Sequence, residues 1–389
     1  MLRQSLSIKN RTLVFKGFIV ELIPYLEKMQ GLGASDLFVT VGFPVSAKVN
    51  GQITSIGSSN LSEEDALALV HGAMSDKQKD EFEHTKECNF AIVCDGIGRF
   101  RCSAFWQRDT AAMVMRRITT QIPQVSELGL PEVLKDVIMS KRGLLLFVGA
   151  TNTGKSTSLA ALIGYRNQNS KGHILTIEDP IEFVHEHANC VVTQREVGID
   201  TRSFDSALKS SLRQAPDVIM IGEIRSMQTM EYAMSFADTG HLCVATLHAN
   251  NATQAIERIM HLVPSDQHEK MRFDLSLNMR AIVAQQLVPT SDGKSRVAAI
   301  EILLNSPLVT DLIQRNEIGD LKQAMTKGKE MGMQSFDMAL YDLYKAGKVT
   351  LEHAIHHADS PNDLRLMIKL DSDKGNRLGT LSNVSIDMD

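Results

Sequence analysis

A glycine-rich segment that ends in a lysine and a serine is the first feature of the sequence that suggests chemistry. Residues 149–156 read G-A-T-N-T-G-K-S and follow an apolar stretch, Leu144–Val148. In such a loop, backbone N–H groups and the start of the next helix bind phosphate. We expect Lys155 to reach the β- and γ-phosphates of ATP and the Ser156 hydroxyl to bind Mg²⁺. The predicted nucleotide-binding residues are Gly149, Ala150, Thr151, Asn152, Thr153, Gly154, Lys155, Ser156 and Thr157.

Two further apolar stretches end in carboxylates. Ile174–Ile177 runs into Glu178, and Val218–Ile221 is followed by Gly222 and Glu223. Ligands bind at the carboxyl ends of strands in α/β folds. We interpret Glu223 as the residue that polarises water against the γ-phosphate. Glu178 is predicted to orient Mg²⁺ through water or to position the attacking water, and a solvated acidic turn is an equally weighted alternative.

Two histidines flank a third apolar stretch. His241 and His248 lie on either side of Cys243–Leu247, and we interpret both as sensors of the γ-phosphate; a structural role is the commoner case for a single histidine. No third metal ligand follows at helical or hairpin spacing. The five cysteines form no C-x-x-C pair, so no zinc site is expected, and their scatter suits a reducing cytoplasm.

These candidate residues require a parallel sheet that presents strand ends together. Strands alternating with helices predict that α/β pattern for residues 119–370, with elements at Leu144–Val148, a helix from Lys155, Ile174–Ile177, a helix from Phe204, Val218–Ile221, a helix from Met227, and Cys243–Leu247. From Thr253 onward we expect helices with one strand, Val297–Leu304.

Residues 18–118 predict a smaller, PAS-like α+β domain. Helical spacing at Ile19–Met29 precedes short strands, Asn50-Gly51 is a strong hairpin turn, and Ser62 with Asp65 is a helix cap. The predicted strands are Asp36–Val41, Val45–Val49, Gln52–Ile56, Asn89–Cys94, Arg99–Trp106 and Ala111–Ile118. Thr119–Pro123 is interpreted as a linker, residues 1–17 as an N-terminal tail and residues 371–389 as a disordered tail.

Composition restricts the class of protein. The chain has 389 residues, 43% of them hydrophobic, and a formal net charge of −5. The negative charge argues against a nucleic-acid binder, although a nucleic-acid motor with the same core stays an alternative. No apolar run approaches the roughly 20 residues of a membrane span, so a cytoplasmic protein is expected.

In order, the four blocks resemble the Walker A, Asp box, Walker B and His box of the secretion-type ATPase superfamily. Ile174–His185 and Gly332–Asp337 resemble its pilus retraction branch, the PilT and PilU types. The resemblance covers roughly residues 30–370. It implies a RecA-like ATPase domain after the PAS-like domain, assembly as a hexamer, and ATP hydrolysis that drives type IV pilus retraction in twitching motility. The implied location is the pilus base, peripheral to the inner membrane, with an inner-membrane platform protein as partner.

The resemblance also implies site residues. Lys155, Ser156, Glu178, Glu223, His241 and His248 match its nucleotide and catalytic positions. Arginines of the first domain resemble those that reach a nucleotide across a subunit boundary, and one or two of five are expected to do so: Arg99, Arg101, Arg108, Arg116 and Arg117.

Departures within the branch favour the PilU type, an accessory ATPase that acts with a PilT-type ATPase. Ser306–Arg315 replaces a retraction motif of the PilT type, and the chain extends past the usual end through Leu364–Leu370. Asn152 stands where the family has glycine, which a positive φ would tolerate at modest cost. A self-sufficient PilT-type motor and a ring partner with little hydrolysis are the alternatives.

Overall fold

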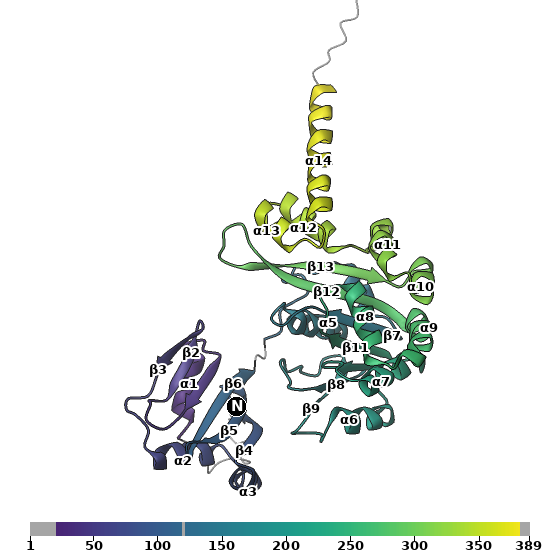
Figure 1. Ribbon diagram of the computed structural model, residues 1–389. Coiled ribbons are helices and arrows are strands. Elements are labelled where there is room, and N and C mark those ends of the chain that lie inside the picture. Colours follow the sequence, from purple (N-terminus) through teal and green to yellow (C-terminus); the bar gives the residue numbers. More distant parts are fainter. Residues whose placement is uncertain (1–20, 119–120, 382–389) are drawn as a thin grey trace, which may run out of the picture. The chain divides into compact units, whose positions relative to one another are not determined.

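The computed structural model describes residues 21–118 and 121–381, in two compact units that meet in sequence at Gln121 and Ile122 (Figure 1). The predicted N-terminal tail and two residues of the predicted linker, Thr119 and Thr120, lie outside the described residues. Each unit has its own core, so we describe each by itself.

The first unit is an antiparallel sheet covered by helices. Its strands are β1 (Asp36–Val39), β2 (Ser46–Val49), β3 (Gln52–Ser55), β4 (Glu87–Cys94), β5 (Gly98–Gln107) and β6 (Thr110–Ile118), and its helices are α1 (Ile23–Gly31), α2 (Glu63–Gly72) and α3 (Asp76–Thr85). The strand order is β3-β2-β1-β6-β5-β4. Burial alternates along β4, which is typical of a strand with one face on the core. The α+β fold predicted for this part is confirmed.

Local signals explain the connections. Asn50 and Gly51 have φ values of 49° and 84°, as a two-residue hairpin turn between β2 and β3 requires. Ser62 caps α2 reciprocally, because its hydroxyl accepts from Asp65 N at 3.1 Å and the Asp65 carboxylate accepts from Ser62 N at 3.4 Å.

The second unit is built on a mostly parallel sheet. Its strands are β7 (Gly143–Val148), β8 (Gly172–Glu178), β9 (Cys190–Glu196), β10 (Val218–Ile221), β11 (Leu242–Leu247), β12 (Met279–Pro289) and β13 (Arg296–Leu304), in the order β13-β12-β7-β11-β10-β8-β9. Only the β12–β13 pairing is antiparallel among these described strands. Every residue of β7 is buried, which is why parallel strands appear as continuous apolar runs.

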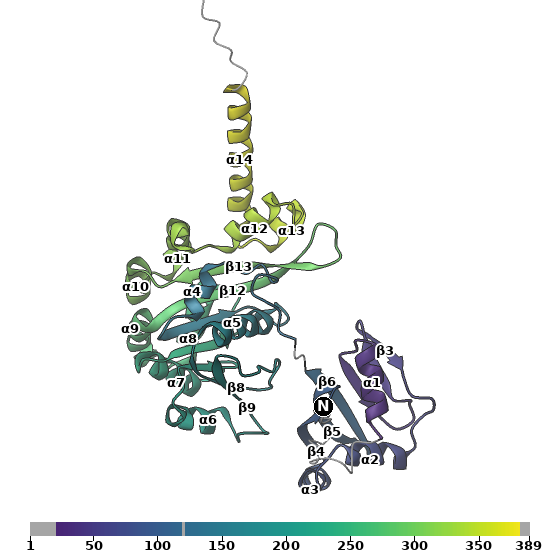
Figure 2. The same cartoon turned by 180° about the vertical axis from the view of Figure 1, so that it is seen from behind.

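Helices cover both faces of this sheet (Figures 1 and 2). One face packs on α4 (Val133–Ile138) and α5 (Lys155–Asn169), and the other packs on α6 (Phe204–Ser211), α7 (Met227–Asp238), α8 (Ala252–Leu262) and α9 (His268–Asn278). β7 serves both cores, because Leu144 and Leu146 face the second set while Leu145 and Phe147 face the first.

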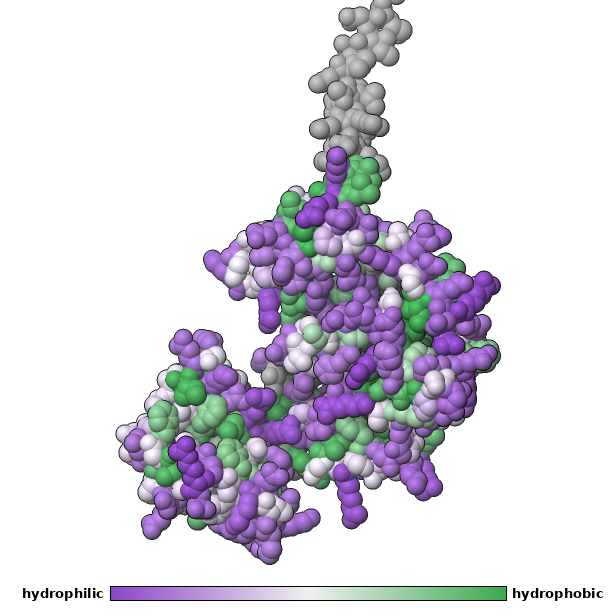
Figure 3. All heavy atoms as spheres, viewed as in Figure 1, coloured by the Kyte–Doolittle hydropathy of each residue, from purple (hydrophilic) through white to green (hydrophobic). Residues whose placement is uncertain are grey.

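Five helices follow the sheet: α10 (Pro307–Gln314), α11 (Leu321–Lys327), α12 (Phe336–Lys345), α13 (Leu351–His357) and α14 (Pro361–Leu381). Short 3₁₀ turns lie at Leu212–Gln214, Ser265–Gln267, Ile318–Asp320 and Lys329–Met331. Figure 3 shows hydrophilic side chains over most of one face and an apolar area at the start of α14, where Leu366 and Leu370 are exposed. Within residues 21–118 and 121–381, no helix has both the length and the apolar content to cross a membrane.

Three expectations need correction. The region after Thr253 contains β12 in addition to the predicted strand, and β9 was not predicted at all. The tail predicted to be disordered from Asp371 continues α14 through Leu381, because each added helical residue gains a hydrogen bond once the packed turn around Leu364 has formed. Residues 382–389 lie outside the described residues.

Candidate active site

The predicted phosphate loop lies between β7 and α5, and its backbone has the turns that a phosphate cradle needs. Gly149 and Gly154 have φ values of 152° and 83°. A Cβ at Gly149 would lie 2.5 Å from the Gln285 carbonyl oxygen, so no other residue fits there without a shift of the backbone. Asn152 has a φ of 63°, which explains why asparagine takes the place of glycine.

Lys155 lies where the prediction requires, at the first turn of α5. Its ammonium donates to the carbonyl oxygens of Gly149 and Ala150, at 2.7 Å each. Thr153 closes the loop by donating to the Ala150 carbonyl at 2.9 Å. The positive charge therefore lies inside the curve of the loop, at the end of a helix that favours anions.

Sequence reasoning missed Gln285, a residue of β12 that supports this loop. The residue is 2% exposed, and its amide nitrogen donates to the Thr153 carbonyl at 2.9 Å. β12 pairs with β7 in parallel, which brings Gln285 beneath a loop 132 residues earlier in the chain. No short-range pattern signals such a contact.

The two predicted acids end adjacent strands at the same edge of the sheet as the loop. Ile177 of β8 pairs with Ile221 of β10, which aligns Glu178 with Gly222 and places Glu223 just beyond. A Cβ at Gly222 would lie 3.2 Å from Glu178 Cα, so the neighbouring strand approaches closely where glycine stands. The shared edge is the ligand-binding edge of α/β sheets.

The Glu223 carboxylate has two basic neighbours. The side chain is 12% exposed, forms an ion pair with Arg225, and has Oε2 3.2 Å from His248 Nε2. That Oε2 atom is within ion-pair range, although it accepts no well-aligned hydrogen bond among the described residues. Two partners thus hold the carboxylate at the strand end, and Arg225 was not predicted.

Glu178 is more deeply buried, and its orientation is fixed. Its Oε1 atom accepts hydrogen bonds from the Thr176 hydroxyl at 2.6 Å and from the Gln194 amide at 3.1 Å. Gln194 lies on β9, the strand that the sequence analysis missed. The alternative of a solvated acidic turn therefore does not hold for Glu178, which is 7% exposed.

The two predicted histidines lie at opposite ends of β11. His248 follows the carboxyl end and approaches Glu223, whereas His241 precedes Leu242 and its carbonyl accepts a hydrogen bond from Gly143 N. Seven residues of extended chain span about 23 Å. The prediction that both sense one phosphate is therefore wrong within one chain, and His241 lies at the edge away from the phosphate loop.

The five arginines lie on the sheet of the first unit and do not form one group. Arg101 of β5 lies opposite Arg116 of β6, and Arg116 Nε donates to Asp36 Oδ1 at 2.7 Å. Arg99 and Arg117 are neighbours of this pair in the same ladder. Arg108, with a φ of 49°, forms the hairpin tip, about 23 Å away along the strand. Arg101 and Arg108 therefore do not belong to one local cluster.

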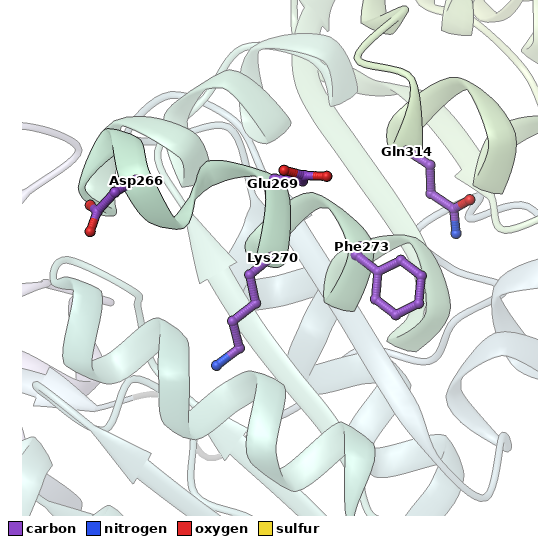
Figure 4. A pocket seen from close by; sticks show the side chains of 5 residues that line it. All are labelled: Asp266, Glu269, Lys270, Phe273 and Gln314. Atoms are coloured by element: carbon purple, nitrogen blue, oxygen red, sulfur yellow. The ribbon is translucent and has the colours of Figure 1, made fainter.

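Two cavities of the second unit are lined by residues outside the phosphate loop. One of about 220 Å³ lies beside Glu223 and Arg225, and one of about 500 Å³ lies by α9 and α10 (Figure 4). The latter is lined by Asp266, Glu269, Lys270, Phe273 and Gln314, none of which belongs to a predicted motif.

No group of three or more possible metal ligands occurs in the part of the chain that the structure describes. A phosphate cradle with an acidic strand end defines the class: a P-loop ATPase.

Comparison with known proteins places this class in a family. The family model described as "Type II/IV secretion system protein" matches residues 17–369. The chain is 60% identical to the type IV pilus ATPase PilU of Pseudomonas aeruginosa, over 91% of this chain and 93% of that protein. It is 39% identical to the type IV pilus retractation ATPase PilT of the same organism, over 89% of this chain and 99% of that protein.

A solved structure supports the same assignment. A crystal structure of the pilus retraction motor PilT with bound ADP superposes with a TM-score of 0.82 and 38% identity, over 90% of this chain and 99% of that one. The chain therefore belongs to the type II/IV secretion system protein family.

Proposed function

We propose that this chain is an ATP-hydrolysing motor for type IV pilus retraction, in the accessory role of the PilU type beside a PilT-type ATPase. The observation that carries the proposal is the contrast of 60% identity to a PilU with 39% to a PilT, each over about nine-tenths of the chain. The altered segment Ser306–Arg315, which contains α10 and its two cap residues, points the same way.

The loop fits the triphosphate of ATP with Mg²⁺. A Cβ would fill the cradle at Gly149, and the Lys155 ammonium lies within it. Ser156 would hold Mg²⁺, which neutralises phosphate charge when bound. We infer that Lys155 exchanges its loop carbonyls for phosphate oxygens and that backbone N–H groups of the loop orient the phosphates.

Glu223 is the proposed base, since its carboxylate lies at the strand end beside the loop. Its role is to accept a hydrogen bond from the attacking water and draw the proton away from it. Arg225 and His248 would set its orientation, and Glu178 would fix the wall of the site. Positioning of this kind supplies most of the catalysis in phosphoryl transfer.

We infer that the working form is a homo-oligomer, a hexamer, with nucleotide between neighbouring copies. Support comes from the arginines of the first unit, which include the pair Arg101 and Arg116. A trans arginine is worth on the order of 10³-fold or more in rate, so turnover would depend on assembly. Sedimentation with ATP and Mg²⁺ tests this; a strictly monomeric species with full activity would overturn it.

The proposed place of work is the cytoplasmic side of the pilus base, peripheral to the inner membrane, with a platform protein as partner and no nucleic acid. The test is to express the chain in cells that lack every other retraction ATPase and to follow labelled pili. We expect no robust retraction until a PilT-type ATPase is restored. Robust retraction by this chain alone would favour the self-sufficient PilT type. Absence of ATP hydrolysis by the purified chain, both alone and with a PilT-type partner that cannot itself hydrolyse ATP, would favour a ring partner with little hydrolysis.

A further inference from the structure

The loop after β11 carries His248 to Glu223 and turns directly into α8. His248 Nε2 lies 3.2 Å from Glu223 Oε2. Three residues later, Asn251 caps α8, because its side-chain oxygen accepts from Gln254 N at 2.9 Å. The loop is so short that whatever fixes Asn251 and the first residue of α8 also limits where His248 can lie.

Glu301 of β13 fixes that first residue. It is 2% exposed, and its Oε1 atom accepts a hydrogen bond from Ala252 N at 2.8 Å. Ala252 begins α8, where the backbone N–H groups have no partner within the helix and the dipole favours an anion. Glu301 pairs with Ala284 of β12, the residue before Gln285, so the same two strands support the phosphate loop and the His248 loop.

A second, exposed contact joins this loop to the C-terminal helices. The Asn251 amide nitrogen donates to Asp359 Oδ2 at 3.3 Å, and Asp359 connects α13 to α14. The next backbone nitrogen, Ser360 N, donates to Asp337 Oδ1 at 3.1 Å, and the other Asp337 oxygen lies 2.6 Å from Lys322 Nζ. A continuous set of polar contacts thus runs from α11 and α12 to the loop that carries His248.

We propose that Glu301 is a positioning residue for ATP hydrolysis: it holds the start of α8, and therefore His248, against Glu223, with Asp359 as a weaker second support. The inference rests on the proposed catalytic site, since it matters only if Glu223 and His248 act there. It gives the C-terminal helices a route by which their position affects turnover.

The surroundings of Glu301 make the contact sensitive to pH. Burial raises the pKa of Glu301 to about 7, and Asp359 adds to the rise, while hydrogen bonds from the Ala252 and Phe336 N–H groups and the charge of Lys322 oppose it. Asp337 and Asp363, each an ion-pair partner of Lys322, are further charged groups on the neighbouring helices. An ionised carboxylate accepts the Ala252 N–H more strongly, whereas its burial costs the whole fold stability. The loop contact itself therefore tightens as pH rises through about 7, while the free energy of unfolding falls.

The test compares Glu301→Leu, which removes the acceptor, with Glu301→Gln, which keeps an oxygen for Ala252 N and removes the charge. In the full-length protein with Mg²⁺ and ATP, we expect Glu301→Leu to lower kcat about tenfold or more and to leave the ATP Kd within about twofold. Glu301→Gln should keep most of the wild-type kcat, and the change of kcat near pH 7 that the wild type shows should disappear. Asp363→Ala, in the same acidic group but without a contact to the loop, is the matched control.

A double-mutant cycle separates positioning from general stability. If Glu301 acts through the loop, Glu301→Leu should lower kcat little further in a protein that already carries His248→Ala. The inference would be overturned if the double variant lost kcat by the product of the two single losses, or if Glu301→Leu kept the wild-type kcat. Unchanged kcat in His248→Ala alone would instead overturn the proposed role of His248. Should Glu301→Leu fail to fold, Ala252→Pro removes the same N–H at a first helical position, where proline is tolerated, and the same loss of kcat is expected.

Discussion

Replacement of Gln285 by methionine is the sharpest test of how the phosphate loop is held. The change keeps the length of the side chain but removes the amide nitrogen that donates to the Thr153 carbonyl at 2.9 Å. A hydrogen bond of this kind contributes about 1 kcal/mol net, and a carbonyl left without its partner costs about 1–3 kcal/mol. Because the loop must be ordered to bind phosphate, we expect the ATP Kd to rise about tenfold, within a range of about 5- to 150-fold.

The assay is equilibrium titration of a fluorescent ATP analogue in the presence of Mg²⁺. Gln286→Met is the control, because Gln286 is the next residue on β12 and its amide donates to the His357 carbonyl instead, at 3.0 Å. Wild-type affinity in Gln285→Met, or an equal loss in Gln286→Met, would refute the reasoning that Gln285 shapes the loop.

Variants at three other positions test separate parts of the structure. The pKa of Glu301 is raised from 4.5 to about 7, so its contribution to the free energy of unfolding is complete below pH 4.5 and is lost as pH rises through about 7. The free energy of unfolding of the wild type, measured with urea, should therefore fall by up to about 3 kcal/mol between pH 5 and pH 8. Glu301→Gln should flatten this fall. Asn152→Ala should cost about 1 kcal/mol, seen as a lower thermal midpoint, whereas Asn152→Gly should not, because φ is 63° there; equal midpoints would contradict this. Lys155→Ala should abolish ATP binding in the same titration, and retention of micromolar affinity would count against the phosphate-loop interpretation.

The sequence predicted the strands that end beside the phosphate loop well, and the reason is local. Leu144–Val148 and Val218–Ile221 are buried parallel strands, so they appear as unbroken apolar runs that end at glycine or an acid. The positive φ considered for Asn152 is also a local property, and the structure has it.

What sequence reasoning missed depends on contacts between distant strands. β9 and β12 carry polar residues, among them Gln194 and Gln285, whose amides bond to Glu178 and to Thr153. These polar residues support the site, and they interrupt the apolar run by which a buried strand is predicted from sequence. Their strands were therefore not predicted.

Strand direction explains the error on His241. Both ends of an apolar stretch look alike in sequence, but a parallel sheet gathers only carboxyl ends at the ligand edge. β11 pairs with β7 from Leu242 with Gly143 to Leu247 with Val148, so His248 continues beside Gly149 and His241 lies at the other edge. Arg108 lies at a hairpin tip with a φ of 49°, and its predicted contact with a nucleotide across a subunit boundary stays a prediction.

Turnover of a Glu223→Gln variant tests the central claim most directly, namely that this chain hydrolyses ATP with Glu223 as the base. Glutamine keeps the size of the side chain but cannot take a proton from water, so the variant should bind ATP with wild-type affinity and lose ATPase activity by about 100-fold or more. Arg225→Gln, which removes an ion-pair partner of Glu223, serves as the matched comparison and should retain more activity than Glu223→Gln. Near-wild-type hydrolysis by Glu223→Gln, measured as phosphate release by the purified protein together with a PilT-type partner that is itself unable to hydrolyse ATP, would contradict the account.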